Sequence, residues 1–357
     1  MATITLEQAM FLRPDRAEPQ LKACSPGFGD AWLPDAQHLI LGFGNRLAGM
    51  RCPLAVFAKP IGSKHIAVVR VMDQTPVFPT GLRFHFLVVE RKIYEAWIRD
   101  PFLLAEKIEP TWDAPAALPA LMIPEEMFQP RTLAQVQGVL KRIKSAALRE
   151  GEDPEAPDFE RTPENSESPA LLGGAQILVD GGRLVFERPE GDLRMVAGLW
   201  LLLPEATRIR LWPTSFAFSQ ELEFDVLVMP RLDEMVLESY TTEEQAADYP
   251  EGTYEIAMQR AAEQGNQADL DGVFNRRDSH HTIRLALLLL VAVSVLVVLS
   301  RWMDAWIAPQ PSSLSVAQKQ AVGAAAIVAA NDPWAQLGMI AYWQKHWKTE
   351  ETPREQK

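Results

Sequence analysis

Residues 82–91 read LRFHFLVVER, a stretch in which apolar and polar side chains alternate. In an extended chain Phe84 and Phe86 fall on one face, whereas Arg83 and His85 fall on the other. This alternation is typical of a β-strand with one buried face, and it guides the interpretation of the first half of the chain.

A second stretch rich in β-branched residues precedes the first. Residues 65–73 read HIAVVRVMD, and the residues between the two stretches, QTPVFPTG, contain the prolines and glycine of a connecting loop. We therefore expect these two stretches to form an antiparallel pair of strands. Residues 38–43 and 54–57 are predicted to add two shorter strands.

Capping residues mark the starts of two helices. Asp100 followed by Pro101 fits an N-cap with proline at the first helical position. Thr132 and Gln135 have the spacing of a capping box, and an apolar stripe of helical period follows until Gly151. We expect a helix to begin at each of these positions.

Residues 151–169 read GEDPEAPDFERTPENSESP and are rich in acidic residues, proline and serine. A segment with so few aliphatic side chains cannot bury enough apolar surface to offset the entropy of ordering it. We predict a flexible acidic insertion here, and we prefer a solvated spacer to a binding site for a basic partner.

Regular structure is predicted to resume after this insertion. Residues 176–179 and 183–187 flank Asp-Gly-Gly, which indicates a hairpin, and residues 193–203 form an apolar helix that ends at a proline. Residues 208–212 and 221–229 alternate in character, and one antiparallel register matches apolar residues on one face and opposite charges on the other. We expect a second antiparallel pair of strands from them.

The composition excludes several classes of protein. Hydrophobic residues make up 47% of the 357-residue chain and charged residues 23%, so the chain can bury a core and is not wholly disordered. Its 35 basic and 47 acidic residues give a net charge of −12, which argues against a nucleic-acid partner. Two cysteines, Cys24 and Cys52, are too few for a disulfide framework and are interpreted as buried thiols.

Residues 285–300, LALLLLVAVSVLVVLS, carry no charge and are bracketed by Arg284 and Arg301. Sixteen residues span roughly 24 Å as a helix, and apolar flanks extend the run toward the ~30 Å of a bilayer core. Trp302 and Trp306 stand where an aromatic belt is expected. The stretch predicts a transmembrane helix over 282–306, with these arginines and tryptophans as membrane-anchor flanks and the lipid bilayer as a partner.

The orientation of this helix follows from the charges around it. Arg276, Arg277 and Arg284 precede the run, whereas Arg301 and Lys319 follow it, and residues 1–20 lack the apolar core of a signal peptide. We therefore expect a single-pass membrane protein whose N-terminal domain is cytoplasmic.

A search for chemistry singles out two residues. Arg46 lies in the glycine-rich stretch 42–49, which lacks the spacing of a nucleotide-binding loop, and His85 lies on the polar face of its strand. Both are kept as speculative interaction or ligand positions, although a tight turn and a structural histidine are the simpler interpretations. The sequence predicts no catalytic residues, no metal site and no cofactor.

Two stretches are similar to a known domain. Ser25-Pro26-Gly27-Phe28 with RFHFLVV at 83–89, and LWLLLPEATRIRLWPTSFAF at 199–218, resemble the N-terminal adaptor-like domain of bacterial GTPase-associated proteins found in conflict-type gene clusters. The resemblance implies a binding module without catalytic residues over residues 20–230. The acidic insertion and the membrane anchor depart from that pattern, and we transfer no site. The whole chain also resembles uncharacterised bacterial single-pass membrane proteins.

Together these patterns predict an α+β domain over 1–232 with antiparallel strand pairs and packed helices. A polar helical connector at 233–281, the transmembrane helix and a short helical tail at 307–357 would follow. We expect a membrane-tethered protein-interaction or scaffold subunit with a protein partner. The alternative is a membrane-bound enzyme whose active site lies in the α+β domain and carries no recognised motif.

Overall fold

The computed structural model divides the chain into two compact units, Met1–Ser279 and His280–Lys357, and each is described by itself. The first unit therefore includes residues 233–279, most of the range that the sequence assigned to a connector. The structure describes residues 3–15, 17–47, 49–74, 81–109, 112, 118–152, 168–275 and 287–300.

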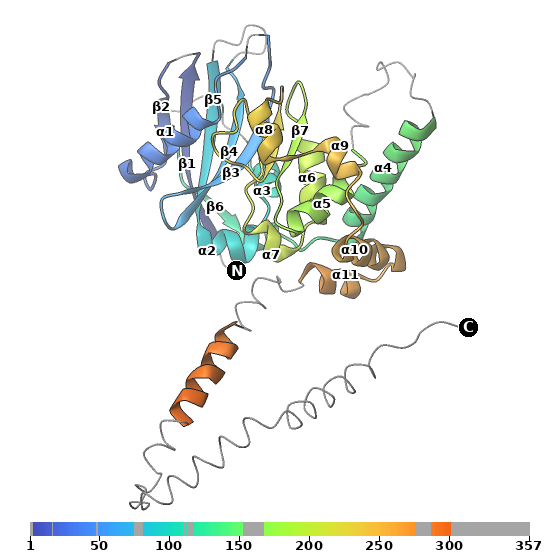
Figure 1. The fold of residues 1–357 in the computed structure, drawn as a ribbon. Helices are drawn as coiled ribbons and strands as arrows, with labels where there is room; N and C mark the ends of the chain where they lie inside the picture. Colours follow the sequence, from blue (N-terminus) through green and yellow to red (C-terminus); the bar gives the residue numbers. More distant parts are fainter. Residues whose placement is uncertain are drawn as a thin grey trace, which may run out of the picture. The chain divides into compact units, whose positions relative to one another are not determined.

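An antiparallel sheet of six strands forms one side of the first unit (Figure 1). The order is β2-β1-β5-β4-β3, and β6 pairs with the remaining length of β1. The strands are β1 (Thr3–Pro14), β2 (Gln20–Cys24), β3 (Ala55–Ile61), β4 (His65–Asp73), β5 (Gly81–Glu90) and β6 (Leu121–Pro124).

The centre of this sheet is the strand pair predicted from the sequence. β4 and β5 are antiparallel, with His65 opposite Glu90 and Asp73 opposite Leu82, so the prediction is confirmed. Both faces of the two strands are largely buried, because Val69 and Phe86 face one layer while Arg70 and His85 face another. β3 confirms the short strand expected at 54–57 and extends it.

β1 is the longest of the described strands, and it was not among the elements predicted from the sequence. Its inner edge pairs with β5 from Glu7↔Val88 to Pro14↔Gly81. β2 pairs with its other edge along the last residues, and β6 pairs with its first residues, Thr3–Leu6.

Residues 38–43 were predicted as a strand, but 38–42 belong to helix α1 (Leu33–Gly42) and Phe43 is its C-cap. The helix has proline in its first turn, and it buries Ala36, Leu39 and Ile40 at helical spacing. Over so short a stretch the apolar residues are compatible with either a helical or a strand period. The proline near the start favours the helix.

The two predicted helix caps are confirmed. Asp100 accepts hydrogen bonds from the amides of Phe102 and Leu103 and so caps α3 (Pro101–Lys107). Thr132 and Gln135 exchange the side-chain bonds of a capping box before α4 (Leu133–Glu152). Short helical turns occupy η1 (Asp30–Trp32), α2 (Arg91–Ile93), the π-helix η2 (Tyr94–Ile98) and η3 (Glu125–Met127).

A second sheet of three parallel strands lies in the other half of the first unit, in the order β8-β7-β9. The predicted hairpin at 176–187 is wrong, because α5 (Leu171–Val179) replaces its first strand. The helix of 193–203 is confirmed as α6. The remaining elements of this part are β7 (Leu184–Glu187), α6 (Leu193–Leu202), α7 (Glu205–Arg208), β8 (Val226–Met229) and β9 (Thr241–Thr242).

The antiparallel pair predicted from 208–212 and 221–229 is also wrong. Residues 205–208 form α7, and β8 pairs with β7 in parallel, with Leu184 opposite Val226. The alternation of charges that suggested the pair has a different origin. Arg208 turns inward to a buried carboxylate, whereas Asp225 binds the amide of Trp212 through its side chain.

Residues 212–218, which we call the bridging segment, connect the two sheets. On one side Ser215 N donates to Val56 O of β3 at 2.9 Å, and on the other Thr214 N donates to Val226 O of β8 at 2.8 Å. The bridging segment thus covers one edge of each sheet. Two more bonds, from Ala58 N to Pro213 O and from Ala217 N to Val228 O, continue the pairing.

Helices after β8 complete the first unit. They pack on α4, α5 and β7, and they bury Tyr254, Met258 and Phe274 in the common core. Most of residues 234–274 are therefore helical. These helices are α8 (Glu234–Ser239), α9 (Glu243–Ala247), α10 (Thr253–Gln264) and α11 (Gln267–Phe274).

The predicted transmembrane helix is wrong. Within the ranges that the structure describes, no helix is long and apolar enough to cross a membrane. The described helix at 287–300 has 14 residues, about 21 Å at 1.5 Å per residue, against the ~30 Å of a bilayer core. The predicted single-pass membrane localisation falls with it. The acidic residues 153–167 and the tail 307–357 lie outside the described residues.

A close helix crossing gives a test of this packing. A Cβ at Gly173 of α5 would lie 2.0 Å from the carbonyl oxygen of Ala246 in α9, so Gly173→Ala forces the helices apart. We expect it to lower the free energy of unfolding by about 3 kcal/mol. Gly272 of α11 has no atom within 4 Å of such a Cβ, and Gly272→Ala should stabilise by up to about 1 kcal/mol. Urea unfolding measures both, and equal effects of the two substitutions would contradict the crossing.

Candidate functional site

Arg46, a candidate ligand residue, is engaged inside the fold. Its guanidinium binds Asp15 at 2.8 Å and Asp73 at 3.1 Å, and its side chain is 6% exposed. The second oxygen of Asp73 accepts the amide hydrogen of Cys52 at 3.0 Å. Arg46 therefore joins the end of β1, the end of β4 and the turn between α1 and β3.

His85, the other candidate, is fully buried on β5. Its Nε2 lies 2.9 Å from Oε1 of Gln8, and Nε2 of Gln8 donates to the carbonyl oxygen of Pro119 at 2.7 Å. With the amide assigned this way, Nε2 of His85 carries the hydrogen. Burial and the nearby Arg70 lower the pKa of His85 to about 4, so the imidazole is neutral at neutral pH.

The structure does not bring the two candidates together. Arg46 contacts Asp15 and Asp73, whereas His85 contacts Gln8 and faces Arg70 across the strand pair. A role for either in ligand binding stays a prediction. The membrane-anchor flanks Arg284, Arg301, Trp302 and Trp306 lie outside the described residues.

One group of largely buried charged side chains was not predicted from the sequence. It forms where the segment before α3, the start of α4 and the short helix α7 meet. We call it the junction cluster, and its members are Arg99, Asp100, Arg131, Glu205 and Arg208.

Glu205 is the centre of the junction cluster. One of its oxygens lies 2.8 Å from Arg131 and the other 2.8 Å from Arg99, and Arg208 binds Asp100 at 2.5 Å. Burial raises the pKa of Glu205, but the neighbouring Arg131 and Arg208 more than offset this and leave the pKa below its usual value. The carboxylate is therefore ionised and paired, which suits a structural tie better than acid–base chemistry.

The backbone around the junction cluster is unusual. A π-helical turn, η2, leads into Arg99, whose φ of 53° lies in the left-handed region that few residues other than glycine adopt. The indole of Trp200 donates to the carbonyl oxygen of Arg99 at 3.1 Å, and the side chain of Arg99 reaches Glu205. These two contacts hold the strained residue in place.

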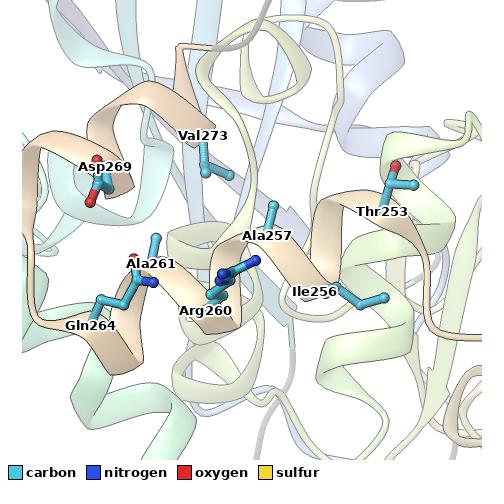
Figure 2. Close-up of a pocket in the computed structure, with 8 residues that line it drawn as sticks. All are labelled: Thr253, Ile256, Ala257, Arg260, Ala261, Gln264, Asp269 and Val273. Carbon is cyan, nitrogen blue, oxygen red and sulfur yellow. The ribbon is translucent and has the colours of Figure 1, made fainter. Parts of the chain in front are cut away.

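A shallow hollow of about 390 Å³ lies between α10 and α11 on the surface of the first unit (Figure 2). Ala257, Ala261 and Val273 line it, and Ile256 borders it with 50% of its surface exposed. Arg260 of α10, between Ala257 and Ala261, and Asp269 of α11 also line it (Figure 2), and we call this feature the α10–α11 groove. Its remaining lining residues are Thr253 and Gln264.

Comparison with known proteins adds no relative: no family model matches the chain, and no curated protein matches it. The residues that the structure describes also contain no group of histidine, cysteine, aspartate and glutamate side chains arranged to hold a metal ion. Inference about function therefore rests on the chain's own geometry.

The junction cluster predicts a large effect on stability. Glu205→Ala leaves the buried Arg131, whose side chain is 6% exposed, without its carboxylate, and we expect a loss of about 3 kcal/mol. Glu263→Ala is the matched control, because its partner Lys144 is exposed and such pairs contribute about 0–1 kcal/mol. Chemical denaturation measures both, and similar losses would show that the cluster is not a buried tie.

His85 predicts a pH dependence. Its pKa is about 4 in the folded protein and 6.5 when exposed, so the unfolded chain takes up the proton first. The stabilisation is complete above pH 6.5 and is lost as the pH falls from 6.5 toward 4, by about 3 kcal/mol. His85→Gln keeps a donor for Gln8 and removes the titration. The variant should lose about 2–3 kcal/mol less than the natural protein between pH 7.5 and pH 4.5, and parallel curves would contradict this.

Proposed function

We propose that the first unit is a protein-interaction module that docks one amphipathic helix of a partner protein in the α10–α11 groove. The groove carries this proposal, because it presents an apolar floor at the surface with the exposed Ile256 at its border. An apolar groove between two helices suits a helix that inserts side chains at i, i+3 and i+4.

The charged side chains of the groove would fix the orientation of a bound helix. Arg260 and Asp269 lie on different helices, so a bound helix meets a cation on one side and a carboxylate on the other. Such an arrangement favours a partner with an acidic residue on one flank of its apolar stripe and a basic residue on the other. Reversing the helix in the groove would place like charges together.

Two further observations support a binding role over catalysis. Arg46 and His85 are buried within the fold, and the junction cluster pairs its carboxylates with guanidinium groups. Under this proposal the fold is a scaffold and the surface helices carry recognition.

The test places a photo-crosslinking side chain at position 256 in the full chain, with position 122 as the control. Met122 is 71% exposed on β6, so general stickiness would label both positions alike. We expect a product at 256 that Arg260→Glu weakens at least tenfold, about 1.4 kcal/mol.

Charge reversal on the identified partner decides the outcome. Replacing the partner's acidic flank residue by lysine should restore binding to the Arg260→Glu protein and weaken binding to the natural one. Equal labelling at 256 and 122, or binding that ignores both charge reversals, would overturn the proposal.

A further inference from the structure

The N-terminal ends of the three parallel strands lie side by side, at what we call the starting edge of the sheet. A polar residue precedes each strand. Leu184, the first residue of β7, lies opposite the first residue of β8 and the first residue of β9. Arg183, Asp225 and Tyr240 directly precede these three first residues. The parallel register therefore brings these three residues to the same edge.

Lys59 of β3 joins this edge from the antiparallel sheet. Its Nζ donates to the carbonyl oxygen of Glu223 at 3.0 Å and lies 5.1 Å from the centre of the Phe224 ring. Glu223 has a φ of 48°, in the left-handed region, and its carbonyl oxygen is the acceptor of this bond. Burial lowers the pKa of Lys59 to about 8, with Arg183 adding to the effect and Asp225 opposing it.

The donors at this edge have unused capacity. Arg183 lies 3.9 Å from both Glu223 and Asp225, which is too far for hydrogen bonds. Tyr240 is 6% exposed, and its hydroxyl has no hydrogen-bond partner within the described part of the chain. The ammonium of Lys59 has three hydrogens, and the carbonyl of Glu223 accepts one.

Of the two carboxylates at the same edge, Asp225 is held by a hydrogen bond and Glu223 is exposed to solvent. One oxygen of Asp225 accepts the amide of Trp212 at 2.7 Å, which fixes that carboxylate beside the bridging segment. The side chain of Glu223 is 75% exposed, so it can turn into solvent when another acceptor arrives. The edge thus has a surplus of donors.

We propose that Lys59, Arg183 and Tyr240 bind an oxyanion, the carboxylate or phosphate group of a ligand. Two cations and a hydroxyl match an acceptor with several oxygens, since hydrogen bonds to charged oxygens are among the strongest in proteins. The buried hydroxyl of Tyr240 gains its missing partner when the anion binds. This site is separate from the α10–α11 groove and does not depend on the function proposed for it.

The test follows the thermal unfolding of the full chain as inorganic phosphate or acetate is added, with chloride keeping ionic strength constant. Tyr240→Phe is the key variant, because it removes a hydroxyl that has no partner without the anion and so should leave the unliganded protein as stable as before. Arg183→Gln removes the loosely paired cation, and Lys144→Met removes an exposed cation elsewhere.

We expect a saturable rise in the melting temperature of the natural protein and of Lys144→Met. Tyr240→Phe should weaken the apparent affinity about threefold to tenfold, and Arg183→Gln by tenfold or more. A response to phosphate alone assigns a phosphate group, and a response to acetate alone assigns a carboxylate. No saturable response to either anion, or equal responses in all four proteins, would overturn the site.

Discussion

The hydrogen bonds on both sides of the bridging segment hold the first unit together. β3 would otherwise be the open edge of the antiparallel sheet, and β8 the open edge of the parallel one. Residues 212–218 cover both edges at once, with Ser215 bonded to β3 and Thr214 bonded to β8. Because buried backbone groups left without partners cost more than a bond contributes, neither sheet is complete without this segment.

The bridging segment also sets where polar groups collect. Trp212 fixes Asp225 just before β8, and α7, which precedes the segment, turns Arg208 and Glu205 inward to the junction cluster. The two collections differ in kind. The junction cluster pairs each carboxylate with a guanidinium group at close range, whereas Arg183, in the group with Lys59 and Tyr240, lies 3.9 Å from its carboxylates. The first is suited to rigidity, and the second has donors to spare for a ligand.

Local patterns predicted local structure well. Alternation identified the β4–β5 pair, and the caps at Asp100 and Thr132 were read correctly because they depend on residues within three positions. The strand predicted at 176–179 is wrong because it lies in α5 (Leu171–Val179). This helix is buried on nearly every side, so its apolar residues show neither a helical nor a strand period. The parallel pairing of β7 was not predicted, because the residues next to β7 in the sequence do not indicate which strands it pairs with. The junction cluster was not predicted for the same reason, because its members Arg99 and Glu205 lie 106 residues apart in the chain.

Because the bridging segment lies far beyond β3 in the chain, β3 stays uncovered for part of protein synthesis. β3 is complete at residue 61, but its cover ends at residue 218, and 157 further residues must be made in between. At 5–20 residues per second, a growing chain displays the uncovered strand for roughly 8–30 s. Protease cleavage of ribosome-bound chains stalled before and after residue 218 would reveal this interval as a loss of susceptibility. During that time the nascent protein is open to strand pairing with a neighbour on the same messenger RNA, so its yield depends on how quickly translation passes this point.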